Sequence, residues 1–88
     1  MKFKTDKKIY ECIKFKDRLL GFMFKSKSDY ALKFNNCNSI HTFFMIKNVD
    51  VYMCDENGNI IYKYLNLKPF KIVLPKKNVT TVYEILKN

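Results

Sequence analysis

Residues 37–46 read Cys-Asn-Ser-Ile-His-Thr-Phe-Phe-Met-Ile, and residues 49–55 read Val-Asp-Val-Tyr-Met-Cys-Asp. β-Branched and aromatic residues dominate both runs, and such residues favour strands. Residues 56–59, Glu-Asn-Gly-Asn, follow at once. An Asn-Gly pair between two β-rich runs predicts a tight hairpin, because both residues tolerate a positive φ. We therefore expect buried strands at 40–46 and 49–55, with a hairpin after the second.

The register of this hairpin follows if Asp55 faces Ile60. Met53 then faces Tyr62 on the same side of the ribbon. By the same register Val51 faces Tyr64. Neither side of the hairpin would be fully polar, so we expect it to lie centrally in the fold, with other elements packed on both faces.

The rest of the chain predicts further short strands and one short helix. Asp17 can cap a helix over residues 18–23, whose apolar side chains form a stripe. Four other segments are rich in β-prone residues and are expected as strands: 8–13, 30–34, 70–74 and 80–86. The predicted fold is mainly β, a compact jelly-roll-like β-sandwich or barrel with one short helix near the N-terminus.

Length and composition predict one folded domain. The chain has 88 residues, 48% of them hydrophobic, with only two glycines and two prolines. Such a composition argues against disorder. We expect a polar N-terminal segment at 1–8, too polar to pack, followed by a single β-rich domain at 9–88.

Several signals predict a cytoplasmic protein. No apolar run approaches the roughly 18–20 residues that a membrane helix needs. Residues 1–8 are charged and have no hydrophobic stretch behind them, unlike a signal peptide. The three cysteines have no Cys-x-x-Cys spacing, which indicates reduced thiols rather than a disulfide framework.

The chain is basic, with 17 lysines and arginines against 8 acidic residues and a net charge of +9. This charge favours nucleic acid or an anionic surface as a partner. However, every basic residue except Arg18 is a lysine, and residues with A/T-rich codons are abundant throughout. Specific nucleic-acid sites tend to use arginine. Nucleic-acid binding is therefore an alternative function rather than the first expectation.

Three segments resemble one known family in order and spacing. Residues 18–23, Arg-Leu-Leu-Gly-Phe-Met, are similar to an arginine–glycine–apolar–Met segment with which the proteins of this family begin. Residues 43–51 are similar to its aromatic–Met–Lys–Asn run leading to an Ile-Asp strand, with Val49 in place of the usual Ile. Residues 55–60 resemble its Asp-x-x-Gly hairpin. The family is domain of unknown function 192.

The resemblance covers residues 9–86 and adds expectations about fold and placement. It implies a jelly-roll-like sandwich with one short helix, and many members of the family are exported. It implies no established activity. The residues ahead of the second motif resemble those of the family's short subgroup from low-GC Gram-positive bacteria: Cys37, Ile40, His41 and Thr42.

Cys37, His41 and Met45 form a candidate metal site, because they are soft ligands at intervals of four. On an extended strand, residues four apart are separated by about 13 Å, too far for one ion to contact two of them. Chelation would need the turn at 35–39 to fold Cys37 back toward His41. We expect these side chains to pack or to fix turns, with metal binding as a weaker alternative and no cofactor.

The sequence carries no recognisable catalytic constellation. His41 as a general base would need a nucleophile and an orienting carboxylate. Asp50 and Asp55 lie an odd number of residues apart, so a regular strand sends them to opposite faces. No Gly-x-Ser-x-Gly, phosphate-binding glycine loop or His-Glu-x-x-His motif occurs. We therefore expect that the protein is not an enzyme.

The first functional hypothesis is a non-catalytic binding or interaction module. Its groove is expected near Arg18, His41, Lys47 and Asp50, and its partner is another protein or a small anionic ligand. Arg18 and Asp50 are expected to form a partly buried ion pair between helix and sheet, with an anion contact by Arg18 as the alternative. A basic nucleic-acid or anionic-surface binder is the second hypothesis, and a Cys/His/Met metal protein the third.

Overall fold

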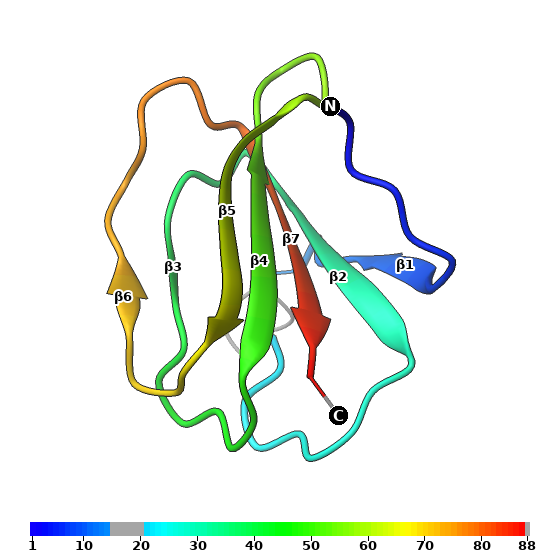
Figure 1. Ribbon diagram of the computed structural model, residues 1–88, viewed down its shortest axis with the longest axis vertical. Helices are drawn as coiled ribbons and strands as arrows, with labels where there is room; N and C mark the ends of the chain where they lie inside the picture. The colour runs from blue at the N-terminus through cyan, green and yellow to red at the C-terminus, as the bar shows by residue number, and fades with distance from the viewer. Residues whose placement is uncertain (15–20, 88) are drawn as a thin grey trace.

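The computed structural model describes residues 1–14 and 21–87, which contain seven strands and no helix. Five strands form a mixed sheet in the order β1-β2-β7-β4-β5, and β3 pairs with β6 in a second, two-stranded sheet (Figure 1). The strands are β1 (Lys8–Glu11), β2 (Tyr30–Asn35), β3 (Ile40–His41), β4 (Val49–Cys54), β5 (Ile60–Leu67), β6 (Ile72–Val73) and β7 (Thr81–Leu86). The mainly β class is confirmed. The barrel alternative is wrong, because the two sheets do not join into a closed ring.

One face of the five-stranded sheet forms the wall of the core. Side chains alternate along a strand, so β7 sends Val82, Glu84 and Leu86 to the same face, where all three are buried. The neighbouring β4 is antiparallel to β7, with Val51 opposite Glu84 and Met53 opposite Val82. We call this buried side of the sheet the inner face.

The second sheet and its loops cover the inner face. Met45, Val73 and Val79, all outside the large sheet, belong to one buried apolar cluster with the inner-face residues of β2, β4 and β7. Contact of two apolar faces removes both from water, which is the main favourable term in folding. The core therefore lies between the large sheet and the layer that contains β3 and β6.

The β4–β5 hairpin confirms most of the predicted register. Met53 pairs with Tyr62 and Val51 with Tyr64, as expected. The pairing of Asp55 with Ile60 is wrong, because the register shifts after Met53 and Cys54 takes that place. The expected central placement holds for β4, which is buried, whereas β5 is the edge strand and is largely exposed.

The strand expected at 40–46 is mostly a turn. Only β3 is extended, and the Met45 amide then donates to the Thr42 carbonyl at 3.2 Å. The buried Thr42 hydroxyl donates to the Lys68 carbonyl at 2.7 Å and accepts from the Lys71 amide at 2.8 Å. These bonds take backbone groups that strand pairing would otherwise use, so the expected strand at 70–74 also shortens to β6.

The helix predicted over 18–23 is wrong for residues 21–23, the part of it that the structure describes. Residues 15–20 lie outside the described residues, and residues 21–24 form a turn. Gly21 has φ 48° and Phe24 has φ 62°, both left-handed, and a right-handed helix cannot continue through such residues. In the described part of the chain, no helix is long and apolar enough to cross a membrane.

The N-terminal segment packs against the outer face of the large sheet. The Phe3 ring stacks on Tyr83 with centroids 4.1 Å apart and lies 5.0 Å from Tyr52. Lys2 forms a bridge to Asn59 beside the hairpin. The expectation that residues 1–8 are too polar to pack is therefore wrong for Phe3, which covers two outer-face tyrosines.

Candidate functional site

Glu84 is a charged residue type in an apolar position. It lies on β7 between Val82 and Leu86, and its partners across the sheet are Leu32 on β2 and Val51 on β4. Only 5% of Glu84 is exposed to solvent. Acidic residues are almost never this buried unless they are paired. Glu84 is therefore the most unusual residue of the inner face.

The Glu84 side chain lines a small cavity between the sheet and the covering layer. The cavity has a volume of about 120 Å³. A site of this size holds several water molecules or a small group of a ligand. Its lining consists of residues 21–23, Phe34, Cys37, residues 39–41, Met45 and Glu84. The walls are largely apolar, and Glu84 is the one carboxyl group among these residues.

The Glu84 carboxyl group has no hydrogen bond or ion pair with any residue that the structure describes. No fully buried side-chain oxygen or nitrogen of the described residues lacks a partner, so the Glu84 carboxyl oxygens remain open to the cavity that they line. Burial alone raises the pKa of Glu84 from 4.5 to about 8. Burial raises the pKa because an apolar site disfavours the charged carboxylate. At neutral pH, Glu84 is therefore mostly a protonated acid, which can donate one hydrogen bond and accept others.

His41 is the last residue of β3 and lines the same cavity, and it is exposed to solvent. Its Nδ1 accepts a hydrogen bond from the Phe43 amide at 3.2 Å, and its ring stacks on Phe43 with centroids 5.1 Å apart. In the neutral ring the proton must then be on Nε2. Nε2 is therefore the nitrogen of His41 that can donate to a bound group.

The three proposed soft ligands share this cavity. Cys37, His41 and Met45 all line it, because the chain turns after His41 instead of continuing as a strand. The Cys37 thiol donates to the Ser39 carbonyl at 3.1 Å, and Met45 is 4% exposed. Among the described residues, no three His, Cys, Asp or Glu side chains are grouped closely enough to hold a metal ion.

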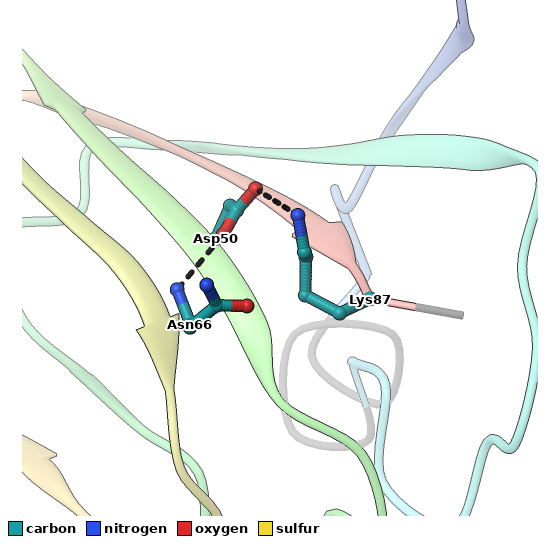
Figure 2. Close-up of polar contacts among 3 residues, drawn as sticks. All are labelled: Asp50, Asn66 and Lys87. Carbon is teal, nitrogen blue, oxygen red and sulfur yellow. Dashed lines mark hydrogen bonds and ion pairs between the residues drawn. The ribbon is translucent and has the colours of Figure 1, made fainter.

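Asp50 lies on the opposite, outer face of the large sheet. It pairs with Ile85 on β7, one residue out of phase with the inner-face positions. Its carboxylate accepts a hydrogen bond from the backbone amide of Asn66 at 2.9 Å and lies 3.3 Å from the Lys87 ammonium. Figure 2 shows both contacts. These contacts fix the irregular end of the β4–β5 pair, and they give Asp50 a structural role.

Of the four residues predicted as a ligand groove, the three that the structure describes lie in different places. His41 is at the cavity, Lys47 is exposed in the loop after it, and Asp50 is on the other face of the sheet. Arg18, and with it the expected Arg18–Asp50 ion pair, lies outside the described residues.

Sequence reasoning missed Glu84, although a signal was present. Residues 80–86 were expected as a strand, and alternation places Val82, Glu84 and Leu86 on one face. A glutamate between two apolar residues of a face is a local exception to the usual pattern of buried strands. That exception could have identified Glu84 as a candidate site residue.

The fold and the cavity define a small, mainly β protein with an acidic group in its interior. The chain is similar to UPF0127 protein PH1112 from Pyrococcus horikoshii, with 40% identity over 73 residues. The match covers 76% of this chain and 62% of the relative. The chain therefore spans less than two thirds of that relative's length. No family model matches the chain.

This finding corrects the resemblance drawn from the motifs. The motifs at 18–23, 43–51 and 55–60 were read as those of the domain of unknown function 192 family and its short low-GC Gram-positive subgroup. The relative that is found carries the UPF0127 name and comes from Pyrococcus horikoshii. Half of the first motif, residues 18–20, lies outside the described part of the structure.

Two solved structures have a similar fold. One is a protein of unknown function from Novosphingobium aromaticivorans, with a TM-score of 0.74 and 14% identity over 89% of this chain and 61% of that chain. The other is a proposed transcription regulator from Sinorhizobium meliloti, with a TM-score of 0.74 and 15% identity over 89% of this chain and 67% of that chain. At these identities the comparison establishes the fold alone.

Proposed function

We propose that the protein is a non-catalytic binding module that accepts a small ligand in the cavity at Glu84. In this proposal the protonated Glu84 donates a hydrogen bond to an oxygen of the ligand, either a carbonyl or a carboxylate. The observation that supports it is a buried Glu84 side chain whose carboxyl group faces the cavity and has no polar partner among the residues that the structure describes.

Burial of the Glu84 carboxyl group among apolar side chains has an energetic cost. A polar group buried without a hydrogen bond costs about 1–3 kcal/mol in mutational data. A chain of 88 residues buries a modest fraction of its surface and has little stability to spare. A bound ligand that accepts a hydrogen bond from Glu84 removes this cost. The free energy recovered in this way adds to the affinity for the ligand.

The charge of the surroundings favours an anionic or neutral ligand over a cation. The chain has a net charge of +9, which attracts anions and repels cations. His41 Nε2 can supply a second donor at the rim of the cavity. A neutral carboxylic acid accommodates a carboxylate because the pair shares one proton. The proposed ligand is therefore a small carboxylate or carbonyl compound.

We propose binding rather than catalysis because the reactive side chains at the cavity are hydrogen-bonded to nearby backbone groups. The Cys37 thiol donates to a backbone carbonyl, and His41 Nδ1 accepts from a backbone amide. Both contacts hold the loop that carries them. A nucleophile paired with a base would need a direct contact between the two groups.

The test is a titration of the protein with small carboxylates and amides, from acetate and acetamide upward, followed by NMR. We expect saturable shifts at the amides of β7 and residues 37–45. Glu84→Leu should abolish them, and Glu84→Gln, which keeps a donor, should retain part of the affinity. Asp50→Asn, on the other face, is the matched control. Shifts that persist in Glu84→Leu would overturn the proposal, as would a failure of every probe to bind.

A further inference from the structure

Three exposed phenylalanines meet at one end of the molecule. Phe24, Phe44 and Phe70 are 68%, 52% and 62% exposed. The ring centroids lie 6.0 Å apart for Phe24 and Phe44 and 5.9 Å apart for Phe44 and Phe70. The rings come from three separate loops that gather at the lower end in Figure 1. We call these three residues the aromatic tip.

The backbone holds the aromatic tip in a conformation that phenylalanine disfavours. Phe24, Phe44 and Phe70 have φ values of 62°, 63° and 62°. A bulky residue in this left-handed region is strained and persists only where the surrounding structure imposes it. The Phe24 amide donates to the Phe44 carbonyl at 3.1 Å, and the Phe70 amide donates to the Thr42 carbonyl at 2.9 Å. The loops are thus fixed to one another with their rings exposed.

The loops of the aromatic tip are uniformly basic. Residues 21–28, 42–48 and 68–72 contain no aspartate or glutamate. They carry five lysines: Lys25, Lys27, Lys47, Lys68 and Lys71. All five are exposed. This charge favours an anionic partner, and it disfavours a second copy of the chain, since like charges would then face one another.

A lipid surface fits the aromatic tip better than nucleic acid does. Stacking of bases requires open ring faces, whereas these rings contact one another in tilted and edge-on pairs. The neighbouring Ile46 and Ile72 are also exposed, at 55% and 58%. Aliphatic and aromatic side chains enter a membrane interface in any orientation, while lysines reach the lipid phosphates. We infer that the aromatic tip docks the protein on anionic phospholipid membranes.

The test uses the full chain and vesicles. Vesicles of three parts phosphatidylcholine to one part phosphatidylserine should co-sediment the protein, and vesicles of phosphatidylcholine alone should do so at least about tenfold less well, because each lysine near an anionic surface adds affinity. Salt at about 0.5 M should weaken the binding strongly, because it screens these charges. Absence of binding to the anionic vesicles would overturn the inference.

Variants separate the roles of rings and charges. Asparagine tolerates a left-handed backbone, so the triple variant Phe24→Asn, Phe44→Asn, Phe70→Asn should remain folded and lose at least about tenfold in vesicle binding. Ile61→Asn, at the hairpin end of β5, is the control and should bind like the parent. Lys68→Glu with Lys71→Glu should remove the preference for phosphatidylserine.

Two results would contradict docking by the tip. Equal losses in the triple variant and in Ile61→Asn would show that the rings have no special part in binding. Tighter binding of a thymidine oligonucleotide than of anionic vesicles, lost in the triple variant, would assign the surface to nucleic acid instead.

Discussion

At the scale of the residue, the demands of folding and of the proposed ligand binding conflict at Glu84. Its neighbours on the inner face are apolar and buried, and a leucine would satisfy the core better than a carboxyl group. Natural proteins accept such local costs mainly at functional sites. This conflict can be measured as stability.

Glu84→Leu is expected to stabilise the protein by about 1–3 kcal/mol, because it removes a carboxyl group with no polar partner among the described residues and supplies an apolar side chain of similar size. Urea denaturation at neutral pH measures the change. Glu84→Gln keeps a polar group in the same place and should gain much less. A destabilised Glu84→Leu would show that the carboxyl group is satisfied in the folded protein.

The same residue predicts a pH dependence of stability. The pKa of Glu84 is raised from 4.5 to about 8 in the folded state, so the folded protein holds a proton that the unfolded chain releases. Stability should therefore fall as pH rises between these two values, by at most about 1.4 kcal/mol per pH unit, and level off above pH 8. Glu84→Gln should lack this slope. Identical slopes in both proteins would refute the assignment.

At the scale of the element, Thr42 links two loops that propensity alone would have made strands. Residues 40–46 and 70–74 have strand-favouring compositions, yet the buried Thr42 hydroxyl bonds the backbone at Lys68 and Lys71. A hydrogen bond between residues this far apart in the chain cannot be predicted from the local sequence. The expectation of two longer strands was therefore wrong.

Thr42→Val is expected to destabilise the protein by about 2–3 kcal/mol, because it leaves the Lys71 backbone amide and the Lys68 carbonyl without their hydrogen-bond partner. Hydrogen exchange should show lost protection at the Lys71 amide. Thr42→Ser retains the hydroxyl and should stay within about 1 kcal/mol of the parent. If valine and serine behave alike, the hydroxyl has no structural part.

At the scale of the whole molecule, the large sheet is covered differently on its two faces. The inner face carries the core, the cavity and the layer with β3 and β6, whereas the N-terminal segment runs from beside the β4–β5 hairpin to β1 (Figure 1). Phe3 covers Tyr52 and Tyr83 on the outer face. The N-terminal segment is therefore part of the folded structure.

Phe3→Ala should destabilise the protein by about 1–2 kcal/mol through loss of the stacked contact and of buried apolar area. Thermal unfolding measures it. Lys4→Ala, the next residue along and exposed, should change stability by less than about 0.5 kcal/mol. Equal effects would mean that the segment does not pack in solution.

The sequence predicted the elements whose pattern is local. Alternation and β-prone residues located β2, β4 and β7, and Asn57-Gly58 located the hairpin and most of its register. The aromatic tip could not be anticipated, since left-handed phenylalanines oppose backbone preference. The candidate site was missed because it depends on which strands lie beside β7, and Glu84 is unusual only once its face is known to be buried.

The central claim is that Glu84 is a buried, protonated acid that faces a ligand cavity. A pH titration of its side-chain carboxyl carbon by NMR tests this claim most directly. We predict a midpoint near pH 8 in the ligand-free protein. A carboxyl group that is already ionised at pH 6 would contradict the claim, and the proposed donor to the ligand would be lost with it.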